Sequence, residues 1–228
     1  MVKVVTNTKL PGYQNITFLR INPEDVSVTI RDIIEQFQNL SWINNFDEDY
    51  LKSSFSERSV PTIKYLKNKL ESDSQDTITT EIGETVVSEL SRSTIINELG
   101  HSDIPLAEII KQKIAGNPGF DFFSEINNEY IIFGEAKYVK GINAYGKAMK
   151  QVDEFVVKRR DKTDLSDIRD FVSKKSLNNA SLGKRAFACG FSSIDIDDST
   201  LISNITNNKY FKTLSQHIEV IYIAINTF

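Results

Sequence analysis

Two short runs of the 228-residue sequence decide the fold: Gly119-Phe-Asp121-Phe-Phe-Ser-Glu-Ile126 and, after Asn127-Asn-Glu129, Tyr130-Ile-Ile-Phe-Gly-Glu135-Ala-Lys137. Both runs are rich in aromatic and β-branched residues, and the asparagine pair between them is typical of a tight turn, so they predict a β-hairpin. If Ile126 pairs with Tyr130, the register places Asp121 directly opposite Glu135, with Cβ atoms about 5 Å apart. Lys137 follows Glu135 by two residues and therefore faces the same side of the strand.

Two carboxylates opposed on a strand pair repel each other and need a counter-charge. A divalent cation supplies it, since Mg²⁺ takes one or two carboxylates and keeps several waters. The second strand begins with four apolar residues, Tyr130 to Phe133, so Glu135 and Lys137 emerge at one end of a buried strand, where α/β proteins usually carry their sites. The hairpin therefore predicts a metal-dependent site built from Asp121, Glu135 and Lys137.

The chain around the hairpin predicts an α/β fold with a mixed central sheet flanked by helices. The expected helices are Glu81–Leu99, Ile104–Ala115, Asn143–Arg159 and Ser166–Ser173, and the further strands are Arg185–Phe191 and Glu219–Ile225. Gly100 ends the first of these helices. The last strand is almost continuously apolar, which predicts burial on both of its faces.

Residues 1–76 are expected to form a small α+β unit that precedes a domain spanning residues 77–228. Its expected elements are strands Val2–Val5 and Ile16–Ile21 and helices Val28–Gln38 and Val60–Leu70, the last with Ser59 as its N-cap and Pro61 in its first turn. The polar, aperiodic stretch Glu71–Asp76 marks the expected boundary. No motif in this unit points to a chemistry.

Composition excludes several classes of protein. With 14 Phe and 8 Tyr the chain has the apolar area that ordering requires, and a single cysteine, Cys189, excludes a disulfide framework or a Cys-rich zinc site. No run is long enough to span a membrane and the start lacks a signal peptide, so we expect a cytoplasmic protein without a membrane partner. There is no P-loop, nucleophile elbow or Rossmann fingerprint.

Charge is unevenly distributed along the chain. The net charge is −4, yet residues 137–185 hold 13 Lys and Arg against 6 Asp and Glu. Two interpretations stay open: a local site for phosphates, or a solvated lysine-rich helix and loop.

The hairpin resembles the PD-(D/E)xK nuclease superfamily, in which an Asp begins one strand and Glu-x-Lys ends the next. Asp121, Glu135 and Lys137 stand in those positions, although the Pro-Asp pair of the superfamily is loosened to Pro118-Gly-Phe-Asp121. The resemblance implies a restriction-endonuclease-like core over residues 77–228. It also implies Mg²⁺ or Mn²⁺ as cofactor, with the carbonyl of Ala136 completing the metal shell.

The superfamily also uses a Glu on the first core helix. The candidates are Glu84, Glu89 and Glu98, and helical periodicity does not choose among them. The Gly-Glu near the start of the helix resembles the superfamily pattern, which favours Glu84 and then Glu89; a solvated helix charge is the alternative for either.

A later helix offers residues for the substrate backbone. Lys147, Lys150 and Gln151 lie one turn apart, where they could reach the scissile phosphate, and a Gln at such a position recurs in parts of the superfamily. An ordinary exposed helix face is the alternative.

These observations predict a magnesium-dependent endonuclease that hydrolyses DNA. The layout is similar to nuclease subunits of prokaryotic antiviral defence systems such as the Hachiman type, which implies a helicase or ATPase partner encoded elsewhere. A stand-alone type II restriction endonuclease and a non-catalytic DNA-binding or partner-holding subunit with a vestigial site stay open, as does a homodimer.

Overall fold

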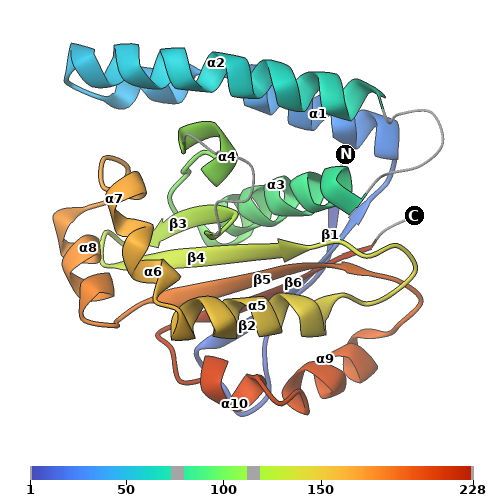
Figure 1. The fold of residues 1–228 in the computed structure, drawn as a ribbon. Coiled ribbons are helices and arrows are strands. Elements are labelled where there is room, and N and C mark those ends of the chain that lie inside the picture. The colour runs from blue at the N-terminus through green and yellow to red at the C-terminus, as the bar shows by residue number, and fades with distance from the viewer. Residues whose placement is uncertain (1, 73–79, 112–118, 227–228) are drawn as a thin grey trace.

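One mixed sheet organises the protein. A computed structural model describes residues 2–72, 80–111 and 119–226, and in it six strands lie in the order β1-β2-β6-β5-β4-β3 (Figure 1). The strands are β1 Val2–Lys9, β2 Ile16–Pro23, β3 Phe122–Ile126, β4 Tyr130–Lys137, β5 Ala186–Ser193 and β6 Val220–Asn226. The four central strands are mutually parallel, and β1 and β3 run antiparallel to them at the two edges. The predicted α/β class with a mixed, helix-flanked sheet is confirmed.

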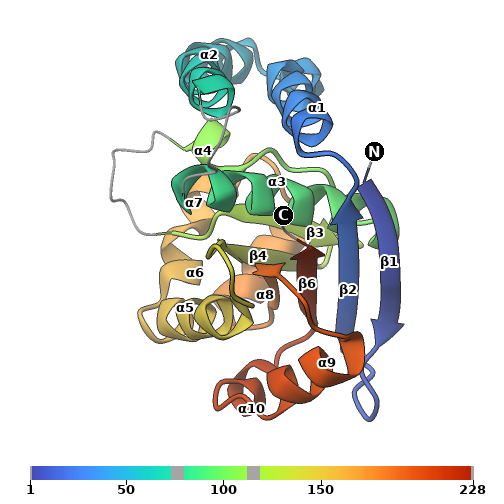
Figure 2. The same ribbon diagram turned by 90° about the vertical axis from the view of Figure 1, so that its right-hand side faces the viewer.

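Helices cover both faces of this sheet. They are α1 Val26–Gln38, the 3₁₀ helix η1 Ser41–Asn45, α2 Asp49–Ser72, α3 Thr80–Leu99, α4 Ala107–Ile110, α5 Tyr145–Val157, α6 Arg160–Thr163, α7 Leu165–Ile168, α8 Lys174–Ser181, α9 Asp198–Thr206 and α10 Phe211–Leu214. Helix α3 lies on one face with α1 and α2 outside it, whereas α5, α9 and α10 lie on the other side (Figures 1 and 2).

The core divides along the sheet because successive strand residues face opposite sides. On β4, Phe133 packs with Met149 of α5, and its neighbour Ile132 packs on the other side in the cluster that contains Val87 of α3. Strand β5 is buried at every residue, as is expected for a central parallel strand covered on both faces.

The N-terminal strands belong to the same sheet as the rest of the chain. Strand β2 pairs in parallel with β6, from Ile16 beside Val220 to Ile21 beside Ile225. A boundary between residues 1–76 and 77–228 is therefore not visible in the sheet. The polar stretch expected to mark it falls largely on residues 73–79, outside the described residues.

Two predicted helices have different bounds in the structure. Helix α2 begins at Asp49, so Ser59 does not cap it; the Ser59 side chain is buried within the helix and donates to the Ile109 carbonyl at 3.3 Å. Packing against α4 outweighs the local capping signal, and Pro61 lies inside the helix. The helix expected over 166–173 is correct only at its start, where α7 covers Leu165–Ile168. Ser173 is instead the N-cap of α8 and accepts from the Ser176 amide.

The helix expected over residues 104–115 is only partly described. Residues 107–110 are helical, as α4, and residues 112–118 lie outside the described part of the chain.

Candidate nuclease site

The hairpin forms in the predicted register. Ile126 pairs with Tyr130 and Phe122 pairs with Gly134. Both turn residues, Asn127 and Asn128, have positive φ angles of 51° and 55°, a conformation that asparagine tolerates better than most residues. This turn fixes which residues meet at the far end of the hairpin.

Asp121 lies at that far end, opposite Glu135. Its amide donates to the Gly134 carbonyl at 2.9 Å, and its Oδ2 accepts from the Ala136 amide at 2.9 Å. Gly134 is required here, since a Cβ at this position would lie 2.2 Å from the Phe122 ring. The Asp121 carboxylate is therefore held over the C-terminal end of β4.

Glu135 is a fully buried carboxylate. Its strand neighbour on β5 is Cys189, which is also buried. Burial raises the pKa of Glu135 well above its ordinary value, the Asp121 charge raises that pKa further, and the Lys137 charge opposes both. Ionised Glu135 thus depends on a nearby cation.

Lys137 supplies that cation. Its Nζ lies 3.0 Å from Glu135 Oε1 and 3.2 Å from Glu84 Oε1. Although burial alone lowers the pKa of Lys137, the charges of Glu135, Asp121 and Glu84 outweigh it, so the pKa is raised. Lys137 therefore joins β4 to α3 as an ammonium ion.

Glu84 reaches the site because α3 approaches the end of β4 closely. A Cβ on Gly83 would lie 2.2 Å from the Tyr138 ring, so only glycine permits this approach. Glu89 instead binds Arg92, at 2.6 and 2.8 Å, and Glu98 is exposed near the C-terminal end of α3. Of the three candidate glutamates, the structure brings Glu84 to Lys137.

The carboxylates fit a hard divalent cation. Both Glu135 oxygens are buried, Oε1 lies 3.0 Å from Lys137 Nζ, and the Asp121 carboxylate lies beside them. The described residues hold no group of three or more His, Cys, Asp or Glu side chains placed as a metal site. Two carboxylates and a carbonyl suit Mg²⁺, which keeps several waters.

Helix α5 covers the side of β4 that carries Glu135. Met149 and Val152 pack with Phe133, two residues before Glu135 on the same face. The predicted backbone-binding residues lie on this helix: Lys147 and Lys150 are exposed and Gln151 is half-buried. Lys150 pairs with Glu154 at 3.5 Å.

The basic segment is partly neutralised within the fold. Arg185 pairs with buried Asp161 at 3.1 Å, Lys158 pairs with Glu154 at 3.7 Å, and Lys175 pairs with Glu129. These cations support the fold or other surfaces, so the local excess of charge overstates what remains for a ligand.

The sequence analysis did not predict the contact that fixes Phe120, the residue before Asp121. Asp164 accepts from the Phe120 amide at 3.0 Å and pairs with Lys111 at 3.0 Å, which fastens the start of β3 to α6 and α7. More than forty positions separate Asp164 from Phe120, and no local pattern indicates such a contact.

Comparisons of the sequence with protein-family models and with curated proteins give no match. Among the described residues, no helix combines the length and the apolar character needed to cross a membrane.

Proposed function

We propose that the protein is a Mg²⁺- or Mn²⁺-dependent endonuclease that hydrolyses phosphodiester bonds of DNA. The observation that carries this proposal is the convergence of Glu84, Asp121, Glu135 and Lys137 at the C-terminal end of β4. The buried Glu135 carboxylate lies beside the half-buried Asp121 carboxylate, an arrangement that costs stability unless a cation balances it. Carboxylates that can hold a divalent cation and a lysine that can stabilise negative charge on a phosphate are the groups that phosphodiester hydrolysis requires.

Each side chain has a role in this reaction. Asp121 and Glu135, with the carbonyl of Ala136, hold the metal ion, which when bound neutralises phosphate charge and lowers the pKa of the attacking water. Lys137 presents a positive charge to the phosphate oxygens as negative charge develops on them. Glu84 holds the Lys137 ammonium in position from α3.

Helix α5 extends the proposed site along the DNA backbone. Lys147, Lys150 and Gln151 contact phosphates, which orients the duplex without reading its sequence. We place the enzyme in antiviral defence, with a helicase or ATPase subunit as partner. A stand-alone restriction endonuclease is the alternative, and co-purification of a motor protein separates the two.

Plasmid cleavage in Mg²⁺ tests the proposal, with the wild type beside Lys137→Ala and with Lys140→Ala as control. Lys140 is exposed three residues further along the chain. We expect Lys137→Ala to lose on the order of 100-fold in rate, as loss of one transition-state contact does, and Lys140→Ala to cut normally. In Ca²⁺ the wild type is expected to bind DNA without cutting it. A wild type that binds DNA but cuts in neither Mg²⁺ nor Mn²⁺ is a non-catalytic subunit, and the proposal is then wrong.

A further inference from the structure

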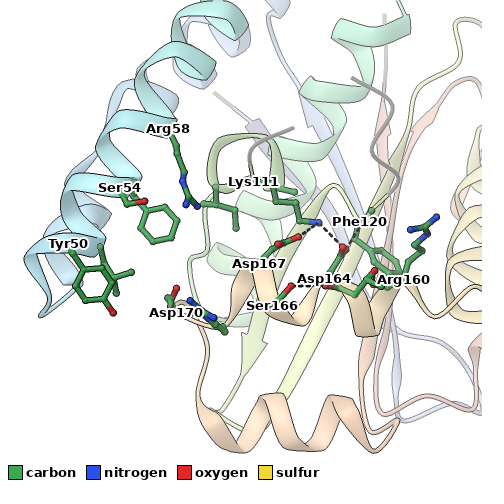
Figure 3. A pocket seen from close by; sticks show the side chains of 17 residues that line it. Tyr50, Ser54, Arg58, Lys111, Phe120, Arg160, Asp164, Ser166, Asp167 and Asp170 are labelled. Atoms are coloured by element: carbon green, nitrogen blue, oxygen red, sulfur yellow. Dashed lines mark hydrogen bonds and ion pairs between the residues drawn. The ribbon is translucent and has the colours of Figure 1, made fainter. Parts of the chain in front are cut away.

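A groove runs beside the candidate nuclease site, between α2 on one side and α6 and α7 on the other. Its volume is about 580 Å³. Figure 3 shows Tyr50 at one end, Phe120 and Arg160 at the other, and Arg58 extending from α2 between them. Phe120 immediately precedes Asp121, so the groove ends next to the proposed metal ligand, just before the start of β3.

The groove has unpaired positive charge. Its acidic residues already have cations: Lys111 lies 3.0 Å from Asp164 and 3.9 Å from Asp167, and Arg169 lies 3.5 Å from Asp170. Arg58 and Arg160 form no ion pair within the described part of the chain. The guanidinium of Arg58 lies over the Phe55 ring, 5.8 Å from its centroid, and Nε of Arg160 is buried without a hydrogen bond. A planar guanidinium group without an ion-pair partner can donate parallel hydrogen bonds to the oxygens of a phosphate.

The groove also offers a surface for stacking. Tyr50, at one end of the groove, is 69% exposed, and Ser54 lies one turn further along the same helix (Figure 3). Successive bases of a single strand stack on such aromatic side chains while cations follow the backbone. The volume is within the range of pockets that hold one drug-sized ligand, a size that suits a short stretch of single strand.

We infer that this groove binds a single strand of nucleic acid next to the cleavage site, with Tyr50 stacking on a base and Arg58 and Arg160 contacting phosphates. The inference rests on the proposed nuclease function and adds a substrate class to it: DNA with an unpaired segment on one side of the bond that is cut. Asp164 lines the groove and accepts a hydrogen bond from the Phe120 amide. A nucleic-acid strand in the groove would therefore lie against the residues that position Asp121.

Binding of a fluorescein-labelled oligothymidylate, followed by anisotropy in Ca²⁺ at several salt concentrations, tests the groove. The variants are Tyr50→Ala and Arg58→Glu. Tyr65→Ala and Lys64→Glu are matched controls, since both residues are exposed on the same helix but do not line the groove. All four positions are exposed, so folding is not at risk.

We expect Tyr50→Ala to weaken binding about tenfold or more, as the loss of one base stack does. Arg58→Glu is expected to weaken binding and to flatten the slope of log K against log salt by about 0.7, the contribution of one phosphate contact on a single strand. The control variants are expected to bind within about twofold of the wild type, as exposed residues outside the contact do.

The inference is overturned if the wild type does not bind the oligothymidylate, if both groove variants bind like the wild type, or if the controls lose as much. Failure of the inference is distinct from failure of the proposed function. If the protein cuts plasmid in Mg²⁺ but the groove variants bind like the wild type, the proposed nuclease function stands and the groove inference is wrong. If the protein never cuts DNA but only the groove variants lose oligothymidylate binding, the groove binds a single strand and the proposed nuclease function is wrong.

Discussion

Replacing Lys137 with Met removes the cation on which the buried Glu135 carboxylate depends. The substitution keeps the volume of the side chain but leaves Glu135, whose side chain is 1% exposed, beside Asp121 without its cation at 3.0 Å. Removing one partner of a buried ion pair costs about 3–5 kcal/mol, because the other charge is then buried alone. For a chain of this length each kcal/mol lowers the melting temperature by about 2–4 °C, so a fall of about 10 °C is expected.

The loss depends on pH in a defined direction. Glu135 has a folded-state pKa above its ordinary value of 4.5, so its ionisation opposes folding, and stability falls as pH rises from 4.5 through the raised pKa. Lys137 lowers that pKa, so Lys137→Met extends this window to higher pH. The melting temperature of the variant, measured in EDTA, is therefore expected to recover towards that of the wild type as pH falls from 8 to about 5.5.

A double-mutant cycle with Glu135→Gln identifies the cause. Glu135→Gln alone is expected to be neutral or slightly stabilising, since it removes a buried charge while Lys137 keeps Glu84 at 3.2 Å. In that background Lys137→Met is expected to cost less than about 1 kcal/mol, a coupling of about 2–4 kcal/mol. The exposed Lys150→Met, which breaks a pair at 3.5 Å with Glu154, serves as control and is expected to cost under about 0.5 kcal/mol. Equal losses from Lys137→Met in both backgrounds would refute the reasoning.

Two further predictions concern stability. Gly134→Ala places a Cβ 2.2 Å from the Phe122 ring and is expected to destabilise the protein by about 1–3 kcal/mol. A Cβ on Gly146 in α5 would have its nearest contact at 3.4 Å, so Gly146→Ala is expected to stabilise the protein by about 0.5–1 kcal/mol. Denaturant unfolding compares the two variants, and equal changes in their free energy of unfolding would contradict the close packing of Gly134 on Phe122. Burial, and secondarily Arg185, lowers the pKa of His217 from 6.5 to about 4, so stability is lost as pH falls through this window. His217→Gln is expected to reduce the loss between pH 7.5 and pH 5 by about 1 kcal/mol, a figure discounted because His217 is only half-buried, and an unchanged pH profile would exclude this role.

The hairpin could be predicted from sequence because its determinants are local. The Asn127-Asn128 turn and the apolar pattern of β4 fix the register, and a shift by one residue would move every side chain to the opposite face of the sheet. The opposition of Asp121 and Glu135 follows directly. The apolar run that forms β6 likewise indicates a central strand, although not its partners.

The remaining features depend on contacts that no local pattern contains. Strand β2 adds the N-terminal strands to the sheet by pairing with β6, two hundred residues later, and apolar parallel strands carry no label for their partner. Sequence periodicity could not choose Glu84 over Glu89. The choice is made by the close packing of Gly83 on Tyr138, a contact between elements.

The position of Lys137 explains how the chain can fold with Glu135 buried beside Asp121. A buried Glu135 carboxylate beside the half-buried Asp121 carboxylate is unstable without a counter-charge. The Lys137 ammonium, anchored to Glu84 on α3, is a counter-charge built into the chain itself. The Glu-x-Lys spacing therefore stabilises the fold, because the two-residue period of a strand puts the Lys137 ammonium on the same face as the Glu135 carboxylate. If a metal binds there as proposed, it would take over from Lys137 as the counter-charge to the carboxylates, and Lys137 would then be available to a phosphate.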